Sequence, residues 1–380
     1  MHTFRVFDQQ IGLVPAAVAR TLGAVDTARG REDAFRLQRP QVLEALVDVA
    51  RIQSTEASNA IEEIIAPRKR IEALVTHKTT PRNRTEAEIA GYRAVLDVIH
   101  SDARQIPFRP SVVAQLHRDL YQYTTVPAGH WKTVDNAIEE VGLDGARRLR
   151  FQTVAAVDTP AAMEELHRRF LQAREAGEHH PLLLIGAYVF DFLAIHPFRD
   201  GNGRMARLLT LLLLYQSGYD VGRYVSLERL VNEARDGYYD SLRAAGHGWH
   251  DDRHSIWPWL EYLLGILLVA YREFEDRVGT VADGRGAKTV AIERFIRERI
   301  PDEFTIADVR EAGIGASDSL IGKVLTRLRN EGAIQSLGTG RSARWRRLSP
   351  DLARTRETSG QQTLGEDLER FPAELTDPFE

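Results

Sequence analysis

The residues best suited to chemistry in this chain of 380 residues lie between two apolar stretches, in the segment 196–207. That segment reads His-Pro-Phe-Arg-Asp-Gly-Asn-Gly-Arg-Met-Ala-Arg. His196, at the end of the first apolar stretch, is placed to take a proton from an attacking hydroxyl group. Asp200 offers a hard carboxylate for a Mg²⁺ ion that bridges phosphates. Arg204 and Arg207 are three residues apart, so on a helix both can point toward one chain of phosphates.

The turn of this segment favours anion binding. It is formed by Gly201, Asn202 and Gly203. Glycines let backbone N–H groups converge on an anion, and the N-terminus of a following helix adds partial positive charge. A base, a metal ligand, a nest of amides and two arginines together predict nucleotidyl transfer.

The composition is that of a globular protein, with 43% hydrophobic and 27% charged residues and a net charge of −4. The absence of cysteine excludes disulfides, thiolate metal sites and cysteine nucleophiles. The sequence does not begin with a basic segment followed by an apolar run. The apolar run 208–214 is too short for a membrane span, and 257–271 contains Glu261. We therefore expect a cytoplasmic protein without a membrane partner.

The elements that must position the chemical residues are mainly helical. Hydrophobic residues repeat at three- and four-residue spacing along most of the chain, which predicts a mainly α fold. The best strand candidates, 137–141 and 148–154, are separated by a segment with an Asp-Gly turn, which predicts a β-hairpin. We expect an N-terminal helical region 1–105, a catalytic core 106–278, a linker 279–287, a module 288–348 and a disordered acidic tail 349–380.

The module 288–348 looks like a winged helix-turn-helix, with three predicted helices and a basic hairpin. Between residues 321 and 347 there are seven Lys or Arg residues and one Glu, whereas 349–380 contains eight Asp or Glu residues and three Arg. The basic face could meet a DNA backbone, and the acidic tail could cover it. Use of the module for protein contacts or dimerisation stays open.

The segment 196–207 resembles the signature of the Fic (Fic/Doc) family at every defining position. The resemblance implies a helical Fic core with a small hairpin flap and transfer of AMP from ATP to a Ser, Thr or Tyr hydroxyl of a target protein. It implies that His196 is the general base and that Asp200 holds Mg²⁺. Asn202 and the glycine backbone would seat the α-phosphate, Arg204 would contact the β-phosphate and Arg207 the γ-phosphate.

A second segment, 58–64, is similar to the inhibitory motif of Fic proteins. Ser58 and Glu62 match that motif, whereas Glu63 stands where a small residue or Asn is usual. A carboxylate that reaches Arg207 would occupy the γ-phosphate position and leave the α-phosphate of ATP misaligned. The same glutamate could position a water molecule that removes AMP from a modified target, and the sequence leaves that open.

Two more segments resemble parts of the family's substrate site. The first resembles the flap whose strand edge would pair with the target backbone, and its residues are Trp131, Asn136, Ala137 and Ile138. A plain surface hairpin with Trp131 as a core anchor is the alternative. The second is the pair Tyr238 and Tyr239, which would line the nucleotide pocket if it is not simply part of the core.

Two functions of different kind remain open at this stage. The first is a protein adenylyltransferase restrained by Glu62. The second is a DNA-binding transcriptional regulator whose Fic core acts as a sensor or uses another nucleotide donor. The complete motif favours the enzyme, because a pure binding protein would not need His196. A homodimer is an expectation from analogy alone.

Overall fold

A computed structural model of the chain describes residues 2–11, 13–38, 40–141, 147–282, 287–298, 300–312, 316–338 and 343–348. The chain divides into two compact units, Met1–Val278 and Gly279–Glu380. Parts of the sequence predictions lie outside the described residues, namely the hairpin turn 142–145, residues 283–286 of the linker, residues 339–341 of the wing turn and the tail 349–380. None of the helices in the described part of the chain combines the length and apolar character that a membrane span requires.

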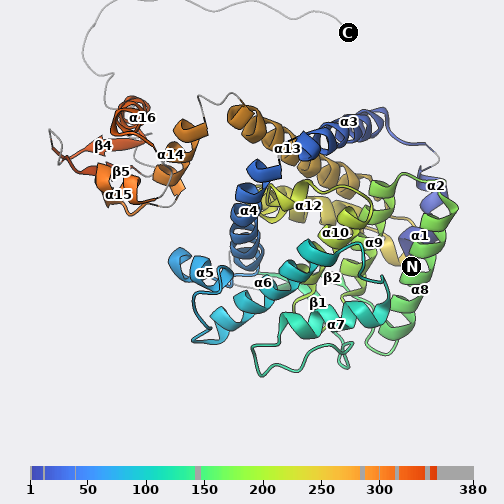
Figure 1. Cartoon of the computed structure of the whole chain (residues 1–380). Helices are drawn as coiled ribbons and strands as arrows, with labels where there is room; N and C mark the ends of the chain where they lie inside the picture. Colours follow the sequence, from blue (N-terminus) through green and yellow to red (C-terminus); the bar gives the residue numbers. More distant parts are fainter. Residues whose placement is uncertain are drawn as a thin grey trace, which may run out of the picture. The chain divides into compact units, whose positions relative to one another are not determined.

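The first unit is built from helices with one small hairpin in its described part (Figure 1). Its α-helices are α1 (His2–Arg5), α2 (Phe7–Ile11), α3 (Ala16–Gln38), α4 (Pro40–Ile61), α5 (Arg68–Val75), α6 (Arg84–Asp102), α7 (Pro110–Leu120), α8 (Thr159–Ala176), α9 (Pro181–Ile195), α10 (Asn202–Gln216), α11 (Leu227–Glu233), α12 (Arg235–Gly246) and α13 (Trp257–Ala282). Two 3-10 turns are η1 (Val221–Arg223) and η2 (Trp249–Asp251). The strands β1 (Ala137–Val141) and β2 (Arg147–Gln152) pair antiparallel. The predicted mainly α fold is confirmed.

Helix α9 is buried on all sides, from Leu182 to Ile195. A helix that is apolar all round is stable only when neighbours cover it, and α8 and α10 pack against it. Pro181 stands in its first turn, where the missing N–H costs no helical hydrogen bond. The helix ends at Ile195 because Pro197 disfavours the helical conformation for His196. The end of α9 therefore determines where His196 lies.

The larger hydrophobic cluster of the first unit takes residues from Phe4 to Val278, and a smaller cluster joins α4, α5 and α6. The larger cluster takes residues from both sides of position 105, so the predicted regions 1–105 and 106–278 share a core. Helix α4 packs against α6 and α11 within this unit. This packing brings the end of α4 to the start of α10, with consequences for the site described below.

The second unit has helices α14 (Ala287–Glu298), α15 (Ile306–Glu311) and α16 (Asp318–Asn330). Its short strands are β3 (Glu303–Phe304), β4 (Ile334–Ser336) and β5 (Trp345–Arg347), in the sheet order β3-β5-β4 with antiparallel pairing. Thr305 caps α15 and Ser317 caps α16 through their side chains. The interpretation of this unit as a winged helix stays a prediction.

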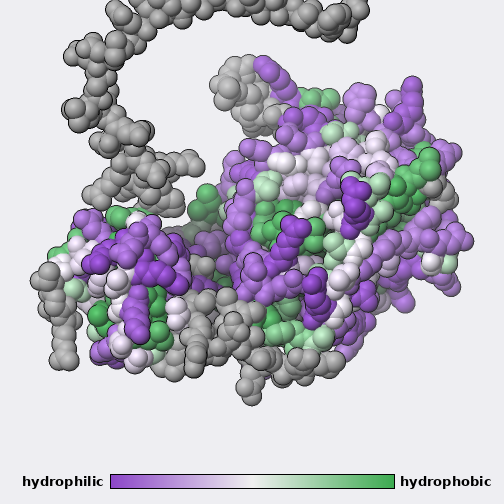
Figure 2. Space-filling view, turned by 90° about the horizontal axis from the view of Figure 1, so that it is seen from above, coloured by the Kyte–Doolittle hydropathy of each residue, from purple (hydrophilic) through white to green (hydrophobic). Residues whose placement is uncertain are grey.

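The described surface is largely hydrophilic on the face seen in Figure 2, with hydrophobic side chains in separate areas. Exposed large hydrophobic residues come from distant parts of the sequence, among them Leu13, Ile65, Val134, Leu149 and Val157. Scattered exposure of this kind is ordinary for a globular surface.

Candidate functional site

The loop 196–201 joins α9 to α10, and the side chain of Asn202 closes it. Asn202 Oδ1 accepts a hydrogen bond from the Phe198 N–H at 2.9 Å, and Nδ2 donates to the Phe198 carbonyl at 2.8 Å. The Phe198 ring is fully buried and stacks on His117 with ring centres 3.7 Å apart. The Asn202 side chain is thus engaged within the loop. The first backbone N–H groups of α10 have no partner within the helix, which leaves them as donors for an anion.

His196 has the left-handed conformation, with φ 53° and ψ 59°. Few residues other than glycine adopt it, so surrounding contacts must hold this backbone in place. Its Nδ1 lies 3.2 Å from the Leu193 carbonyl, so Nδ1 carries the hydrogen and Nε2 keeps its lone pair. Burial lowers the pKa of His196 to about 4, and the nearby Lys132 ammonium acts in the same direction. The imidazole is therefore neutral at pH 7 and can accept a proton.

His117 holds the loop from the side of α7, a role that the sequence did not suggest. Its Nε2 lies 3.0 Å from the Asp200 carbonyl oxygen, and its Nδ1 accepts from the Gly129 N–H at 2.9 Å. Burial lowers the pKa of His117 to about 4, so the ring is neutral and donates through Nε2. The Asp200 side chain itself is exposed, and its Oδ1 accepts from the Gly201 N–H at 2.6 Å.

The guanidinium of Arg204 is only 1% exposed and is held by two residues. It donates to the Tyr121 hydroxyl at 2.8 Å and forms an ion pair with Glu88 at 2.9 Å. Its Nε and Nη1 atoms are buried and have no partner among the described residues. Buried donors are normally satisfied. Arg204 therefore has N–H groups left for a ligand such as the predicted β-phosphate.

Arg207 joins α10 to the end of α4. Its Nε donates to Ser58 Oγ at 2.8 Å, and its Nη2 donates to the Ser58 carbonyl at 2.9 Å and to Glu62 Oε1 at 2.8 Å. A Cβ atom built on Gly203 would lie 2.2 Å from Glu62 Oε1, so this carboxylate lies directly against the first turn of α10. A negative charge is stabilised there by the N-terminus of α10. The predicted contact between Glu62 and Arg207 is present.

The residue after Glu62 has an unusual backbone conformation. Glu63 has φ 61°, the left-handed region that favours glycine. The Ile64 N–H bonds back to the Asn59 carbonyl at 3.0 Å and closes the end of α4. Arg235 of α12 donates to the Ile61 carbonyl at 2.9 Å. The contact from α12 thus helps to hold a turn in which Glu63 occupies a position that favours glycine.

The base of the predicted flap contacts the loop 196–201. Asn136 Nδ2 donates to the Phe198 carbonyl at 3.0 Å and lies 3.4 Å from the His196 carbonyl. Trp131 is partly buried, with its ring 5.1 Å from that of Phe198. Ala137 is exposed and begins β1, and the partly buried Ile138 pairs with a residue of β2. The structure therefore brings the flap residues next to the loop, with Trp131 packed as an anchor.

A buried lysine, Lys132, was not singled out from the sequence, although it lies in the flap segment. It is 4% exposed, and its Nζ lies within 3.0 Å of three acceptors, the side chains of Asn136 and Thr153 and the carbonyl of Ile195. Burial lowers its pKa to about 8. A lysine before a predicted hairpin is common in protein sequences, so this pattern alone did not identify Lys132 as a buried residue beside the loop.

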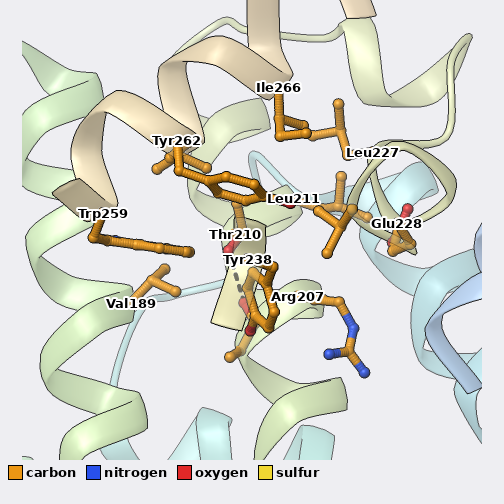
Figure 3. A pocket seen from close by; sticks show the side chains of 13 residues that line it. Val189, Arg207, Thr210, Leu211, Leu227, Glu228, Tyr238, Trp259, Tyr262 and Ile266 are labelled. Carbon is orange, nitrogen blue, oxygen red and sulfur yellow. Dashed lines mark hydrogen bonds between the residues drawn. The ribbon is translucent and has the colours of Figure 1, made fainter. Parts of the chain in front are cut away.

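Tyr238 lines a small cavity of about 40 Å³ beside Arg207 (Figure 3). The aromatic wall is completed by Trp259 and Tyr262, and the Arg207 guanidinium points away from these two rings. This volume is room for a few water molecules. The Tyr239 ring lies under two guanidinium groups, those of Arg150 at 5.0 Å and Arg235 at 5.7 Å. A contact of either tyrosine with a nucleotide stays a prediction.

The loop residues fit a chain of phosphates with a divalent cation. The fit rests on the unpartnered N–H groups of Arg204, the start of α10 at Gly203 and the exposed carboxylate of Asp200. Within the described ranges no three His, Asp or Glu side chains gather as a metal cluster. Mg²⁺ commonly takes one or two carboxylates and completes its shell with phosphates and water, so a single aspartate is compatible with it.

The basic residues of the second unit are mostly paired with carboxylates. Arg327 contacts both Glu293 and Glu331, and Arg346 bonds to Glu303 at 2.6 Å. Further pairs join Arg344 to Glu303 and Arg347 to Asp302. The side chains in these pairs are between 25% and 81% exposed. The predicted basic face is therefore partly neutralised by the unit's own acids.

Comparison with known proteins finds matches to Fic and Fido domains. The model of the Fic/DOC family matches residues 107–214, which include the loop and the flap. A Fido domain-containing protein of Dictyostelium discoideum is 32% identical over 101 residues, which cover 23% of this chain and 68% of that protein. A protein named protein adenylyltransferase Fic from Nematostella vectensis is 29% identical over 114 residues. That match covers 28% of this chain and only 25% of the Nematostella protein.

Two solved structures share the fold. A Fic family protein from Desulfovibrio desulfuricans G20 superposes with a TM-score of 0.58 at 21% identity, covering 88% of this chain and 97% of that one. Fic-1 of C. elegans superposes with a TM-score of 0.57 at 19% identity, covering 71% of this chain and 74% of that one.

Proposed function

This chain belongs to the Fic/DOC family, and on that premise we propose that it transfers AMP from ATP to a Ser, Thr or Tyr hydroxyl of a protein. Relatives named protein adenylyltransferase support the transfer of a nucleotidyl group. The observation that carries the proposal is that a carboxylate of the protein lies at the start of α10. The Glu62 carboxylate lies against Gly203 and on Arg207, where a terminal phosphate would find the same donors.

In the proposed reaction, the hydroxyl oxygen of the target attacks the α-phosphorus of ATP, and the bond from that phosphorus to the bridging oxygen of the β-phosphate breaks. Nε2 of His196 takes the hydroxyl proton, and pyrophosphate leaves. The low pKa of His196 keeps the imidazole unprotonated before the attack. The amides of the first turn of α10, with Arg204 and Arg207, would stabilise charge on the phosphates. Asp200 would hold Mg²⁺, which supplies further neutralisation of that charge.

We propose that Glu62 restrains this reaction. Its carboxylate shares Nη2 of Arg207 with Ser58, so a γ-phosphate that needs Arg207 must displace it. ATP that binds without this contact would lie with its α-phosphate out of line for attack. An error of about 1 Å in such geometry can slow a reaction on the order of 100-fold. The wild-type chain is therefore expected to transfer AMP slowly.

We propose that the target binds as an extended segment along the flap. Main-chain hydrogen bonds to a strand edge accept many different side chains. Because Asn136 joins the base of β1 to the loop backbone on both sides of Pro197, a segment paired with the flap would lie near His196. This supports a protein substrate with an accessible hydroxyl residue in an extended stretch.

Labelled nucleotides test the proposal. We expect Glu62→Gly to increase incorporation from labelled ATP about 100-fold over the wild type, and Glu62→Gly with His196→Ala to incorporate none. The exposed Glu44 lies on α4, the helix that directly precedes Glu62, and Glu44→Ala serves as the matched control with unchanged incorporation. GTP, UTP and CTP tested in parallel identify the donor, and mass spectrometry locates the modified residue.

Two outcomes would count against the proposal in different ways. Equal incorporation by the wild type and Glu62→Gly would contradict the restraint by Glu62. A lack of incorporation from all four nucleotides in both proteins would contradict the transfer reaction itself.

A further inference from the structure

The backbone around His196 is bound from outside by two residues of the flap segment. The four successive carbonyl groups of residues 195–198 each accept a hydrogen bond. Lys132 Nζ donates to Ile195 at 3.0 Å and the Lys132 backbone N–H donates to Pro197 at 2.8 Å. Asn136 Nδ2 donates to Phe198 at 3.0 Å and reaches His196 at 3.4 Å.

We propose that Lys132 is a positioning residue, whose ammonium group joins the base of the flap to the end of α9 and so fixes His196 relative to the bound target. The inference rests on the proposed transfer reaction. Lys132 itself donates no proton to the reaction and touches no substrate in this proposal. It acts through the backbone of residues 195–197.

The hydrogen bonds of the Lys132 ammonium are complete. A protonated lysine has three N–H donors and no acceptor. Its three acceptors are Asn136 Oδ1 at 2.7 Å, Thr153 Oγ1 at 2.9 Å and the Ile195 carbonyl at 3.0 Å. Asn136 precedes β1 and Thr153 follows β2, so the two ends of the flap hairpin meet at one positive charge. Both ends of the hairpin are therefore connected through Lys132 to the Ile195 carbonyl at the end of α9.

The third acceptor explains why a charge is useful at this point. Ile195 is the last residue of α9, and the final carbonyl groups of a helix have no partner within it. The helix C-terminus also carries partial negative charge, which an ammonium group stabilises. Lys132 therefore satisfies the orphan carbonyl next to a residue with left-handed backbone, where the chain would otherwise be free to relax.

The side chain of Asn136 connects the Lys132 ammonium group to the carbonyl groups of the loop. Its Oδ1 accepts from Lys132, which turns its Nδ2 toward the carbonyl groups of the loop. Thr153 Oγ1 also lies 2.6 Å from the Asn136 carbonyl, so the strand base is closed before β1 begins. Removal of the ammonium group would release the orientation of the Asn136 amide and leave Ile195 without its partner. Both losses act on the position of the His196 ring.

The test uses the full chain with Glu62→Gly, so that transfer can be measured. We expect Lys132→Met, which keeps the length and removes the charge, to lower kcat about 100-fold with a change in the KM for ATP of less than about threefold. Lys132→Arg keeps a positive charge and N–H donors at this position and is expected to retain more of kcat than Lys132→Met. The exposed Lys78 provides the matched control, and Lys78→Met should leave both constants unchanged.

Hydrogen exchange gives a second measurement that does not depend on activity. In Lys132→Met, amides of 195–203 should exchange at least about tenfold faster, with α6 and α13 unchanged. A kcat within about threefold of the Glu62→Gly parent would overturn the proposal, as would a loss carried mainly by KM. If the parent transfers nothing, exchange decides alone: faster exchange confined to the loop supports the proposal, and unchanged exchange overturns it. If Lys132→Met unfolds, Asn136→Ala is measured in its place with the same criteria, because it removes one acceptor of the ammonium group and both side-chain contacts with the loop carbonyls.

Discussion

The two units of this chain treat their positive charges in opposite ways. Around the catalytic loop, Lys132, Arg204 and Arg207 are buried, and each is held by specific acceptors. In the second unit, Arg344 and Arg346 are at least half exposed and pair with a carboxylate at the surface. Buried ion pairs cost much to break because one charge is left without water or partner. Exposed pairs contribute little because water and salt replace the partner.

The two units also differ in their histidine content. All twelve histidines lie in the first unit, and the second unit has none. Unfolding of the first unit therefore exposes groups that bind protons near neutrality, whereas unfolding of the second unit exposes mainly carboxylates. Removing the partner of a charged side chain should lower the stability of the first unit, and more so the deeper that side chain is buried. The same change should barely alter the stability of the second unit. The four predictions below test this contrast, from the largest expected effect to the smallest.

Mild acid should destabilise the first unit selectively. Burial lowers the pKa of His100 to about 3 and that of His117, His167 and His254 to about 4. A histidine whose folded pKa is depressed contributes its full stability above the unfolded value of about 6.5, and that contribution is lost as the pH falls from 6.5 to the folded value. At pH 5 each of these buried histidines weakens folding by on the order of 2 kcal/mol.

Hydrogen exchange at pH 7 and pH 5 measures this effect in each unit separately. Glu32, Glu56 and Asp191 act in the opposite sense, because burial raises the pKa of each of these carboxyl groups, and they offset part of the loss from the histidines. In the second unit the Arg346 guanidinium lowers the pKa of Glu303, so that contribution is lost only below about 4.5. Equal loss of protection in both units between pH 7 and pH 5 would contradict the prediction.

Removal of Glu88 should have the next largest effect. Glu88→Ala leaves the buried guanidinium of Arg204 without its carboxylate, and breaking such a pair costs about 3–5 kcal/mol. Urea unfolding followed by tryptophan fluorescence measures the change. Tyr121→Phe removes only the neutral partner of Arg204 and should cost clearly less. A Glu88→Ala protein as stable as the wild type would show that this buried pair behaves like a surface one.

Glu63 offers a smaller and purely local test. A non-glycine residue in the left-handed region costs about 1 kcal/mol, so Glu63→Gly should stabilise the turn that presents Glu62 to Arg207. Residual AMP transfer by the otherwise wild-type chain should then fall about fivefold. Glu63→Ala removes the same charge and keeps the strain, and should leave the rate unchanged. If glycine and alanine behave alike, the backbone of Glu63 has no part in the restraint.

The smallest change is expected from Glu303→Ala in the second unit. It removes the partner of Arg344 and Arg346, but both side chains stay hydrated, so the urea midpoint should not move measurably. The freed arginines should delay elution from heparin at low salt. Arg346→Ala in the same background should reverse the delay. Unchanged elution would contradict the expectation from the sequence that this face meets a DNA backbone. Marked destabilisation would contradict the contrast between the two units.

The loop between α9 and α10 could be predicted from sequence because its signals are local. His196, the turn 201–203 and Arg207 lie within twelve residues, and both glycine spacing and helix periodicity act over that range. The hairpin was predicted for the same reason, since alternation and an Asp-Gly turn are short-range signals. The contact between Glu62 and Arg207 spans 145 positions, and it was expected only through the resemblance to a family motif.

Tertiary contacts without a local pattern could not be predicted. Glu88 and Arg204 are on different helices, and no spacing rule relates them. Lys132 meets the end of α9 only because the chain folds the flap against it, and one lysine in a polar segment resembles many others. The departure at Glu63 from the family motif was visible in the sequence. Its positive φ was not, because a glutamate does not indicate the left-handed region.

Gly203 has a consequence for how this protein can change by mutation. Any side chain at position 203 would collide with the Glu62 carboxylate and would also enter the nest of amides that a nucleotide needs. Such a substitution would remove the restraint and the activity together. On the proposed function, substitutions at Glu62 would remove the restraint alone. A genetic selection for hyperactive alleles should therefore recover changes at position 62 and should not recover changes at position 203, so the lineage can lose its self-restraint at the glutamate while the glycine stays constant.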